Sequence, residues 1–121
     1  MKRWIVAASL AALMMPVPAA AMTVDQFLAR VNALKAKGLL AMFSSDIRVL
    51  KAEVDDANAA WQADKNARRA AGKPPLNCAP PGASLSRDEF LAALAELSPA
   101  QRAMSMREGF AYVAIAKFPC R

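Results

Sequence analysis

The chain has 121 residues, a length that accommodates one domain, and it contains no histidine. The missing histidine excludes serine–histidine and cysteine–histidine nucleophile systems and most zinc sites. The formal charge at pH 7 is +6, and this excess of basic residues does not by itself indicate nucleic-acid binding.

The first 21 residues have the order of a secretory signal peptide. Lys2 and Arg3 precede an uncharged apolar run over residues 4–15, and residues 19–21 form a small-residue cleavage site. We expect cleavage after Ala21, which leaves a domain over residues 22–121 with a formal charge of +4, because Lys2 and Arg3 are lost. The alternative is an uncleaved anchor, although Pro16 and Pro18 make the run a weak bilayer span.

The first helix is expected over residues 24–37. Thr23 as N-cap and Gln26 three residues later form a capping box, and Gly38 can end the helix with a positive φ. Apolar residues follow at helical spacing and predict one core-facing stripe, made by Phe27, Val31 and Leu34.

A second helix of about 25 residues, roughly 37 Å long, is expected after a short apolar connector over residues 39–43. Ser44 or Ser45 is its N-cap, and Gly72 and Pro74 stop it. Its basic end is expected to project beyond the core, because the apolar stripe weakens after Trp61. That stripe comprises Ile47, Leu50, Val54, Ala57 and Trp61.

Residues 73–85 contain four prolines and predict a stiff, partly extended loop. Ser86 and Glu89 form a capping box for a third helix, and Ser98 and Gln101 form another. With Pro99 at its first position, the last helix is expected over residues 99–118. Its core stripe would comprise Met106, Phe110 and Val113, broadened by Ala103, Tyr112, Ile115 and Phe118. The predicted fold is an all-α domain of four helices.

The chain has two cysteines, Cys78 in the proline-rich loop and Cys120 at the penultimate position. In an exported chain, two cysteines indicate one disulfide. Such a bond would stabilise the fold by about 4 kcal/mol in the chain-entropy account. The alternative is two unrelated free thiols.

The basic cluster Lys65, Arg68, Arg69 and Lys73 is the candidate partner-binding site, and the loop would present Leu76 and Asn77 beside it. Cations at a helix C-terminus are also explained by the helix dipole alone. The functional alternative is docking to an acidic protein surface or a cell-wall polymer. No convergent catalytic set, metal site or cofactor motif is present, so we do not expect an enzyme.

Four features together resemble one family of proteins: the Ala-x-Ala signal, the helix opening Met-Thr-Val-Asp-Gln-Phe-Leu, the proline-flanked Cys78 and the ending Lys-Phe-Pro-Cys. The chain is similar to the Rap/Tai family of type VI secretion immunity proteins of Gram-negative bacteria. The resemblance implies a helical, disulfide-bonded periplasmic inhibitor, often a homodimer, that blocks a peptidoglycan amidase effector with a protruding loop or helix. Only Cys78 and Cys120 match a family feature by position.

A second hypothesis is a small structural or stress-related periplasmic protein that binds envelope components through its basic end. An inhibitor predicts a tight complex with one enzyme, whereas an envelope protein predicts salt-sensitive and loosely selective association. In neither case do we expect a nucleic-acid partner or a membrane span after cleavage.

Overall fold

A computed structural model of the protein describes residues 22–121. The predicted signal peptide and its cleavage site after Ala21 lie outside the described residues. Within residues 22–121 the fold consists of four α-helices and two 3₁₀ turns, so the predicted all-α class is confirmed. In chain order they are α1 (Val24–Lys37), η1 (Gly38–Phe43), α2 (Asp46–Ala70), α3 (Arg87–Ala95), η2 (Gln101–Ala103) and α4 (Met106–Lys117).

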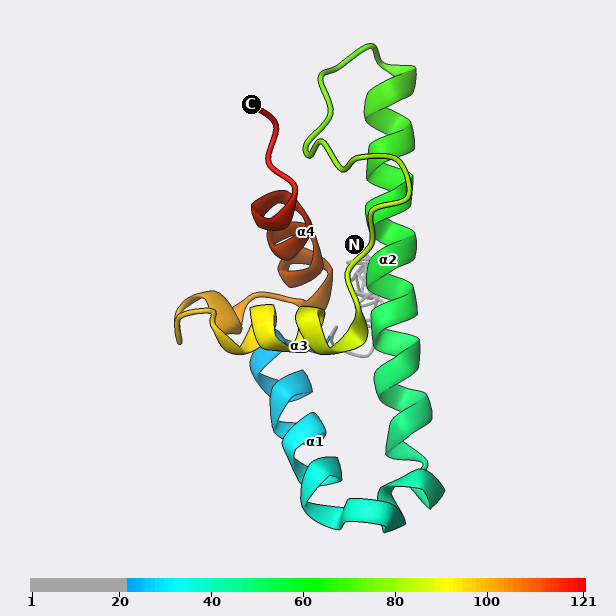
Figure 1. Ribbon diagram of the computed structural model, residues 1–121, viewed down its shortest axis with the longest axis vertical. Helices are drawn as coiled ribbons and strands as arrows, with labels where there is room; N and C mark the ends of the chain where they lie inside the picture. The colour runs from blue at the N-terminus through cyan, green and yellow to red at the C-terminus, as the bar shows by residue number, and fades with distance from the viewer. Residues whose placement is uncertain (1–21) are drawn as a thin grey trace, which may run out of the picture.

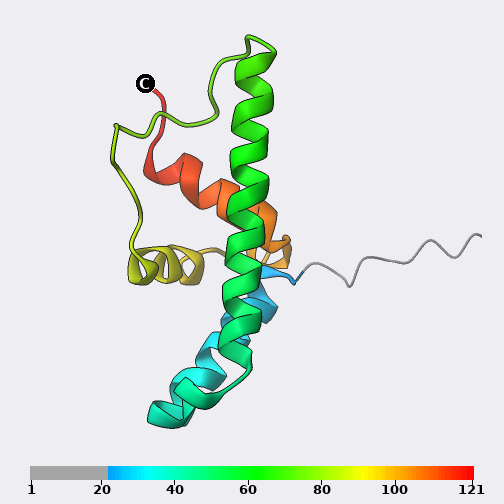
Figure 2. The same ribbon diagram turned by 90° about the vertical axis from the view of Figure 1, so that its right-hand side faces the viewer.

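The long helix α2 is the axis of the molecule, and α1, α3 and α4 lie along one side of it (Figures 1 and 2). Helix α1 and α2 form a helical hairpin joined by η1. Helix α3 lies at the level of the middle of α2 and contacts α1 and α4, and α4 packs more extensively on α2 than any other element does. The hairpin turn lies at one end of the molecule, and the loop after α2 lies at the other.

Helix α1 begins and ends as the sequence predicts. The Thr23 hydroxyl accepts a hydrogen bond from the backbone N–H of Gln26, and the Gln26 side chain accepts one from the backbone N–H of Thr23. Gly38, with φ 58°, ends the helix. Such a positive φ is costly for residues with a Cβ, so glycine suits this position.

Helix α2 has the predicted length of 25 residues, and Ser45 occupies its N-cap position. Ser45 makes no capping hydrogen bond with its side chain. Instead, the Ser44 hydroxyl accepts a hydrogen bond from the backbone N–H of Asp46 at 3.2 Å. The last turns of α2 reach beyond α4 (Figure 1), as predicted for its basic end.

The last helix starts seven residues later than predicted, at Met106. Ser98 and Gln101 do form reciprocal hydrogen bonds, but they cap only the short turn η2. The chain then becomes extended, because the segment around Ser105 pairs with Thr23 in an antiparallel bridge. In that bridge the Val24 N–H donates to the Met104 carbonyl at 3.0 Å, and the Met106 N–H donates to the Met22 carbonyl at 2.9 Å.

The core lies where the four helices meet. The Phe90 and Phe110 rings, 5.4 Å apart, join α3 to α4. The largest fully buried side chains are Val24, Leu94 and Met106. Four residues assigned to the core stripes are exposed, namely Ile47, Ala103, Tyr112 and Ile115. Helical spacing indicates which side chains share the apolar side of a helix, but a domain of this size has too few helices to cover such broad stripes.

Candidate functional site

The predicted partner-binding residues lie at the end of α2 and in the loop that follows it, a region that we call the 65–82 projection. Arg69 and Lys73 are exposed, and Lys65, Arg68 and Leu76 are half-buried. The projection contains four basic residues and no acidic residue. It therefore presents a positive surface at one end of the molecule.

The loop of the projection has little secondary structure but is held at several points. The Arg68 guanidinium donates from Nε to the Pro74 carbonyl at 2.9 Å. The backbone N–H of Lys73 donates to the Arg68 carbonyl at 2.9 Å, and that of Cys78 donates to the Phe118 carbonyl at 2.8 Å. Four prolines in the loop restrict the remaining backbone torsions. The loop is thus pre-organised in one conformation.

The predicted disulfide is present and joins Cys78 to Cys120, with the two Cα atoms 4.8 Å apart. It ties the loop to the segment that follows α4 and closes the fold. The same bond brings Arg121, the last residue, to the positive end of the molecule, where the C-terminus lies (Figure 1).

Asn77 lies inside the fold instead of on the surface. Its side chain is only 7% exposed, and its Nδ2 donates to the Ala114 carbonyl at 3.2 Å. Ala114 lies near the end of α4, and its carbonyl also accepts a hydrogen bond from the backbone N–H of Phe118 at 3.3 Å. Asn77 therefore adds a second donor to this carbonyl and anchors the loop to α4. Among the predicted partner-binding residues, the exposed side chains are Arg69 and Lys73.

An apolar groove lies beside the projection, and the sequence patterns did not reveal it. Its volume is about 900 Å³, and helices α1 to α4 and the loop before α3 all contribute to its walls. Lys65 and Asn77 of the projection also line it. Its apolar walls include Val31, Leu50, Trp61, Leu85, Phe90 and Phe118. All of these residues except Leu85, which belongs to the predicted loop, lie in predicted helices whose apolar stripes indicate core. The open space between the helices becomes visible only in the tertiary structure.

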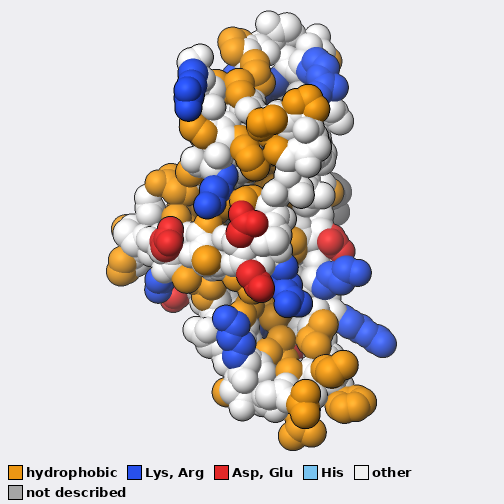
Figure 3. All heavy atoms as spheres, in the orientation of Figure 1, with side chains coloured by type: hydrophobic (Ala, Val, Ile, Leu, Met, Phe, Trp, Pro, Cys, Tyr) orange, Lys and Arg blue, Asp and Glu red, His pale blue; other side chains and the backbone are white. Residues whose placement is uncertain are grey.

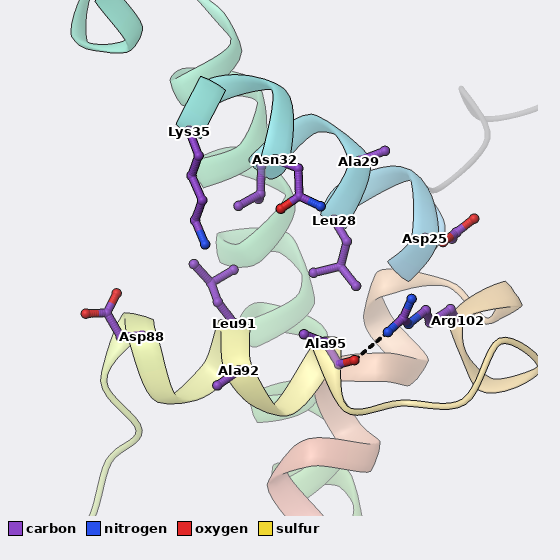
Figure 4. Close-up of a pocket in the computed structure, with 11 residues that line it drawn as sticks. Asp25, Leu28, Ala29, Asn32, Lys35, Asp88, Leu91, Ala92, Ala95 and Arg102 are labelled. Carbon is purple, nitrogen blue, oxygen red and sulfur yellow. Dashed lines mark hydrogen bonds between the residues drawn. The ribbon is translucent and has the colours of Figure 1, made fainter. Parts of the chain in front are cut away.

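A smaller pocket of about 450 Å³ lies between α1 and α3 (Figure 4). Lys35 and Asn32 line it from α1, and Asp88 lines it from the start of α3. Arg102 of η2 reaches the same pocket and donates a hydrogen bond to the Ala95 carbonyl. This bond fastens η2 to the end of α3, so Arg102 has a role within the fold.

A third surface feature is the turn η1, whose four large side chains have no partner in the core. Leu39, Leu40, Met42 and Phe43 are 83%, 72%, 75% and 87% exposed. We call these four residues the apolar tip. In Figure 3 hydrophobic side chains gather at that end of the molecule. The sequence signal was the apolar run over residues 39–43, which is too short to form an amphipathic helix and bury one face.

A close ion pair joins α2 to α4. Arg107 donates from Nε to Asp56 Oδ2 at 2.9 Å and from Nη2 to Asp56 Oδ1 at 2.8 Å. These hydrogen bonds, together with the positive charge of Arg107, hold the pKa of Asp56 below its ordinary value, although partial loss of solvation opposes the shift. Asp56 is exposed and has a structural partner, which leaves no sign of acid–base chemistry at this pair.

No protein-family model, no curated protein and no solved structure matches the chain. Of the helices in residues 22–121, none combines the length and the apolar character that a membrane crossing requires. Within the same residues, no group of three or more acidic or cysteine side chains could hold a metal ion.

Proposed function

We propose that the protein is an exported inhibitor of the immunity class, which binds and blocks a peptidoglycan amidase delivered by type VI secretion. The observation that carries the proposal is the pre-organised, positively charged loop of the 65–82 projection. The disulfide fits an oxidising compartment such as the periplasm. The proposal also rests on the resemblance to the Rap/Tai family at the helix opening, Cys78 and Cys120.

A rigid loop suits an inhibitor for a thermodynamic reason. Ordering a flexible loop upon binding costs conformational entropy, whereas a loop held by a disulfide and prolines has lost most of that freedom on folding. Inhibitor complexes of this kind change little in backbone conformation between the free and bound states. In the proposed complex the projection enters the catalytic groove of the amidase.

The charges of the projection define the partner's surface. Arg69 and Lys73 are exposed and require an acidic rim around the groove that they enter. Arg68 and Asn77 act differently, because they hold the loop and do not reach the partner. Substitution at Arg69 and Lys73 therefore tests recognition, and substitution at Asn77 tests loop rigidity.

Co-expression tests the proposal directly. Peptidoglycan amidases exported in a sensitive host lyse the cells, and we expect this protein to restore growth against one of them. Arg69→Glu/Lys73→Glu is expected to weaken the purified complex at least about tenfold. A matched charge reversal away from the projection, Arg30→Glu/Lys51→Glu, is expected to retain the wild-type affinity.

The second candidate function is binding of anionic envelope polymers, which the uninterrupted positive charge of the projection favours. It predicts association with purified cell-wall material that is lost at high salt and does not discriminate between polymers. If no amidase is neutralised and no hydrolase is retained in periplasmic pull-downs, the immunity proposal is wrong.

A further inference from the structure

The apolar tip has no explanation within the fold. A turn between two antiparallel helices needs a residue that tolerates positive φ, which Gly38 supplies, and otherwise polar residues that water can solvate. Here four large apolar side chains are instead 72–87% exposed. Side chains gathered in this way, at one point of the surface, are typical of an interaction site.

The charged residues that flank the apolar tip are mostly basic. The ends of α1 and α2 that flank the turn, residues 35–51, carry four basic residues and one acidic residue, a formal charge of +3. The acidic residue, Asp46, is paired with Lys37, with Nζ and Oδ2 3.7 Å apart. Of the remaining cations, Lys35 points into the pocket between α1 and α3 (Figure 4). Arg48 and Lys51 are exposed, and their long side chains can extend along apolar surface while their charged ends stay in water.

We propose that the apolar tip inserts into the surface of an anionic phospholipid membrane. The tip is convex, so a flat protein surface would cover only one side of each side chain, whereas the boundary between headgroups and acyl chains surrounds the tip completely. The cations behind it then lie at the level of the lipid phosphates, where each adds to the attraction. Figure 3 shows this order, with hydrophobic side chains at the end of the molecule and Lys or Arg side chains behind them.

Attachment to a membrane through the apolar tip orients the rest of the molecule. The hairpin turn lies at one end of α2, and the 65–82 projection lies at the opposite end (Figure 1). A protein attached through the tip holds the projection away from the membrane and free to contact a soluble partner. The attachment is independent of the proposed inhibitory function, since neither end shares a residue with the other.

Vesicle sedimentation tests the proposal. The purified protein is mixed with vesicles of phosphatidylglycerol and phosphatidylethanolamine, and separately with vesicles of phosphatidylcholine alone. We expect binding to the anionic vesicles only, weakened about tenfold when salt rises from roughly 0.05 M to 0.5 M. Leu40→Ser/Phe43→Ser is expected to lower the partition coefficient at least about thirtyfold. Ile115→Ser is the matched control, because Ile115 is an exposed apolar residue on α4, and it is expected to bind as the wild type does.

A second readout locates the inserted residue. The Phe43→Trp protein is expected to show a blue-shifted emission with anionic vesicles and quenching by lipids brominated on the acyl chain, after subtraction of the wild-type signal. All proteins share one N-terminus, verified by mass spectrometry, so that residues 1–21 contribute equally where they are retained.

Three results would overturn the proposal. If the wild-type protein stays in the supernatant when it is mixed with anionic vesicles, the apolar tip is not a membrane-binding site. Equal binding by Leu40→Ser/Phe43→Ser and the wild type places the contact elsewhere. Self-association that the double substitution abolishes, without any vesicle binding, makes the tip an interface between copies of this chain. None of these results depends on whether an amidase is inhibited.

Discussion

Gly109 lies where α4 meets the start of α1, and the space there admits no side chain. A Cβ built at this position would lie 2.5 Å from Cγ2 of Val24, a fully buried residue. We expect Gly109→Ala to lower the free energy of unfolding by about 1–2 kcal/mol, measured by urea denaturation. The loss outweighs the gain in helix propensity, which is roughly 1 kcal/mol.

The matched control for Gly109→Ala shortens the neighbouring side chain, Val24. In a Val24→Ala background the Cγ atoms are gone, and Gly109→Ala is expected to be neutral or stabilising relative to Val24→Ala alone. An equal loss in both backgrounds would show that steric overlap with Val24 is not the cause.

The Asp56–Arg107 pair gives the stability a defined dependence on pH. Because the pKa of Asp56 is lowered in the folded state, the pair stabilises the fold above the ordinary aspartate pKa, about 3.9. That contribution is lost as the pH falls through the lowered value. We expect Asp56→Asn to lower Tm slightly at pH 7 and to flatten the fall in Tm between roughly pH 5 and pH 3. In Asp55→Asn, at the adjacent exposed position, the wild-type pH profile should persist.

At the scale of elements, the start of α4 depends on one capping hydrogen bond. The Ser105 hydroxyl accepts a hydrogen bond from the Glu108 N–H at 3.2 Å, where the chain leaves its pairing with Thr23. Ser105→Ala is expected to cost about 1 kcal/mol in urea denaturation and to reduce helical circular dichroism. Ser45→Ala is the control, because Ser45 occupies an N-cap position without a side-chain bond. A larger loss at Ser45 than at Ser105 would contradict this account.

The helices differ in how far their ends could be predicted. Thr23 and Gln26 bond to each other's backbone within one turn, so the start of α1 is a local property that the sequence reveals. Ser98 and Gln101 form the same local bonds, yet no α-helix follows them. The difference is the pairing of residues 104–106 with residues 22–24, which requires extended backbone and arises only when distant segments meet.

At the scale of the whole molecule, the disulfide holds the C-terminus to the middle of the chain. Its removal in Cys78→Ser is expected to lower the stability by up to about 4 kcal/mol, which is a large part of the total for a small domain. Thermal unfolding measures the loss, and Asp55→Asn should barely change Tm. Hydrogen exchange should accelerate mainly in residues 73–82, because the bond anchors that loop. Similar losses from both substitutions would contradict the structural role of the disulfide.

The candidate surfaces also differ in how far they could be predicted from the sequence. The sequence indicated a positive end at Arg69 and Lys73, because the apolar stripe of α2 weakens after Trp61 and charged side chains are seldom buried without a partner. Burial of Asn77 could not be predicted, since it depends on the nearby end of α4, where the Asn77 side chain donates to the Ala114 carbonyl. The exposure of Phe43 likewise follows from the distance between the hairpin turn and the core.

By itself, the sequence determined the all-α class, the disulfide pair, the first three helices and the basic end of α2. Each of these depends on local caps, helical periodicity or the count of cysteines. Only the tertiary structure decided where α4 begins, that Asn77 faces inward, and that an apolar groove and an apolar tip exist. These depend on which distant segments approach one another, and a small domain has too few helices to cover every apolar face that periodicity predicts.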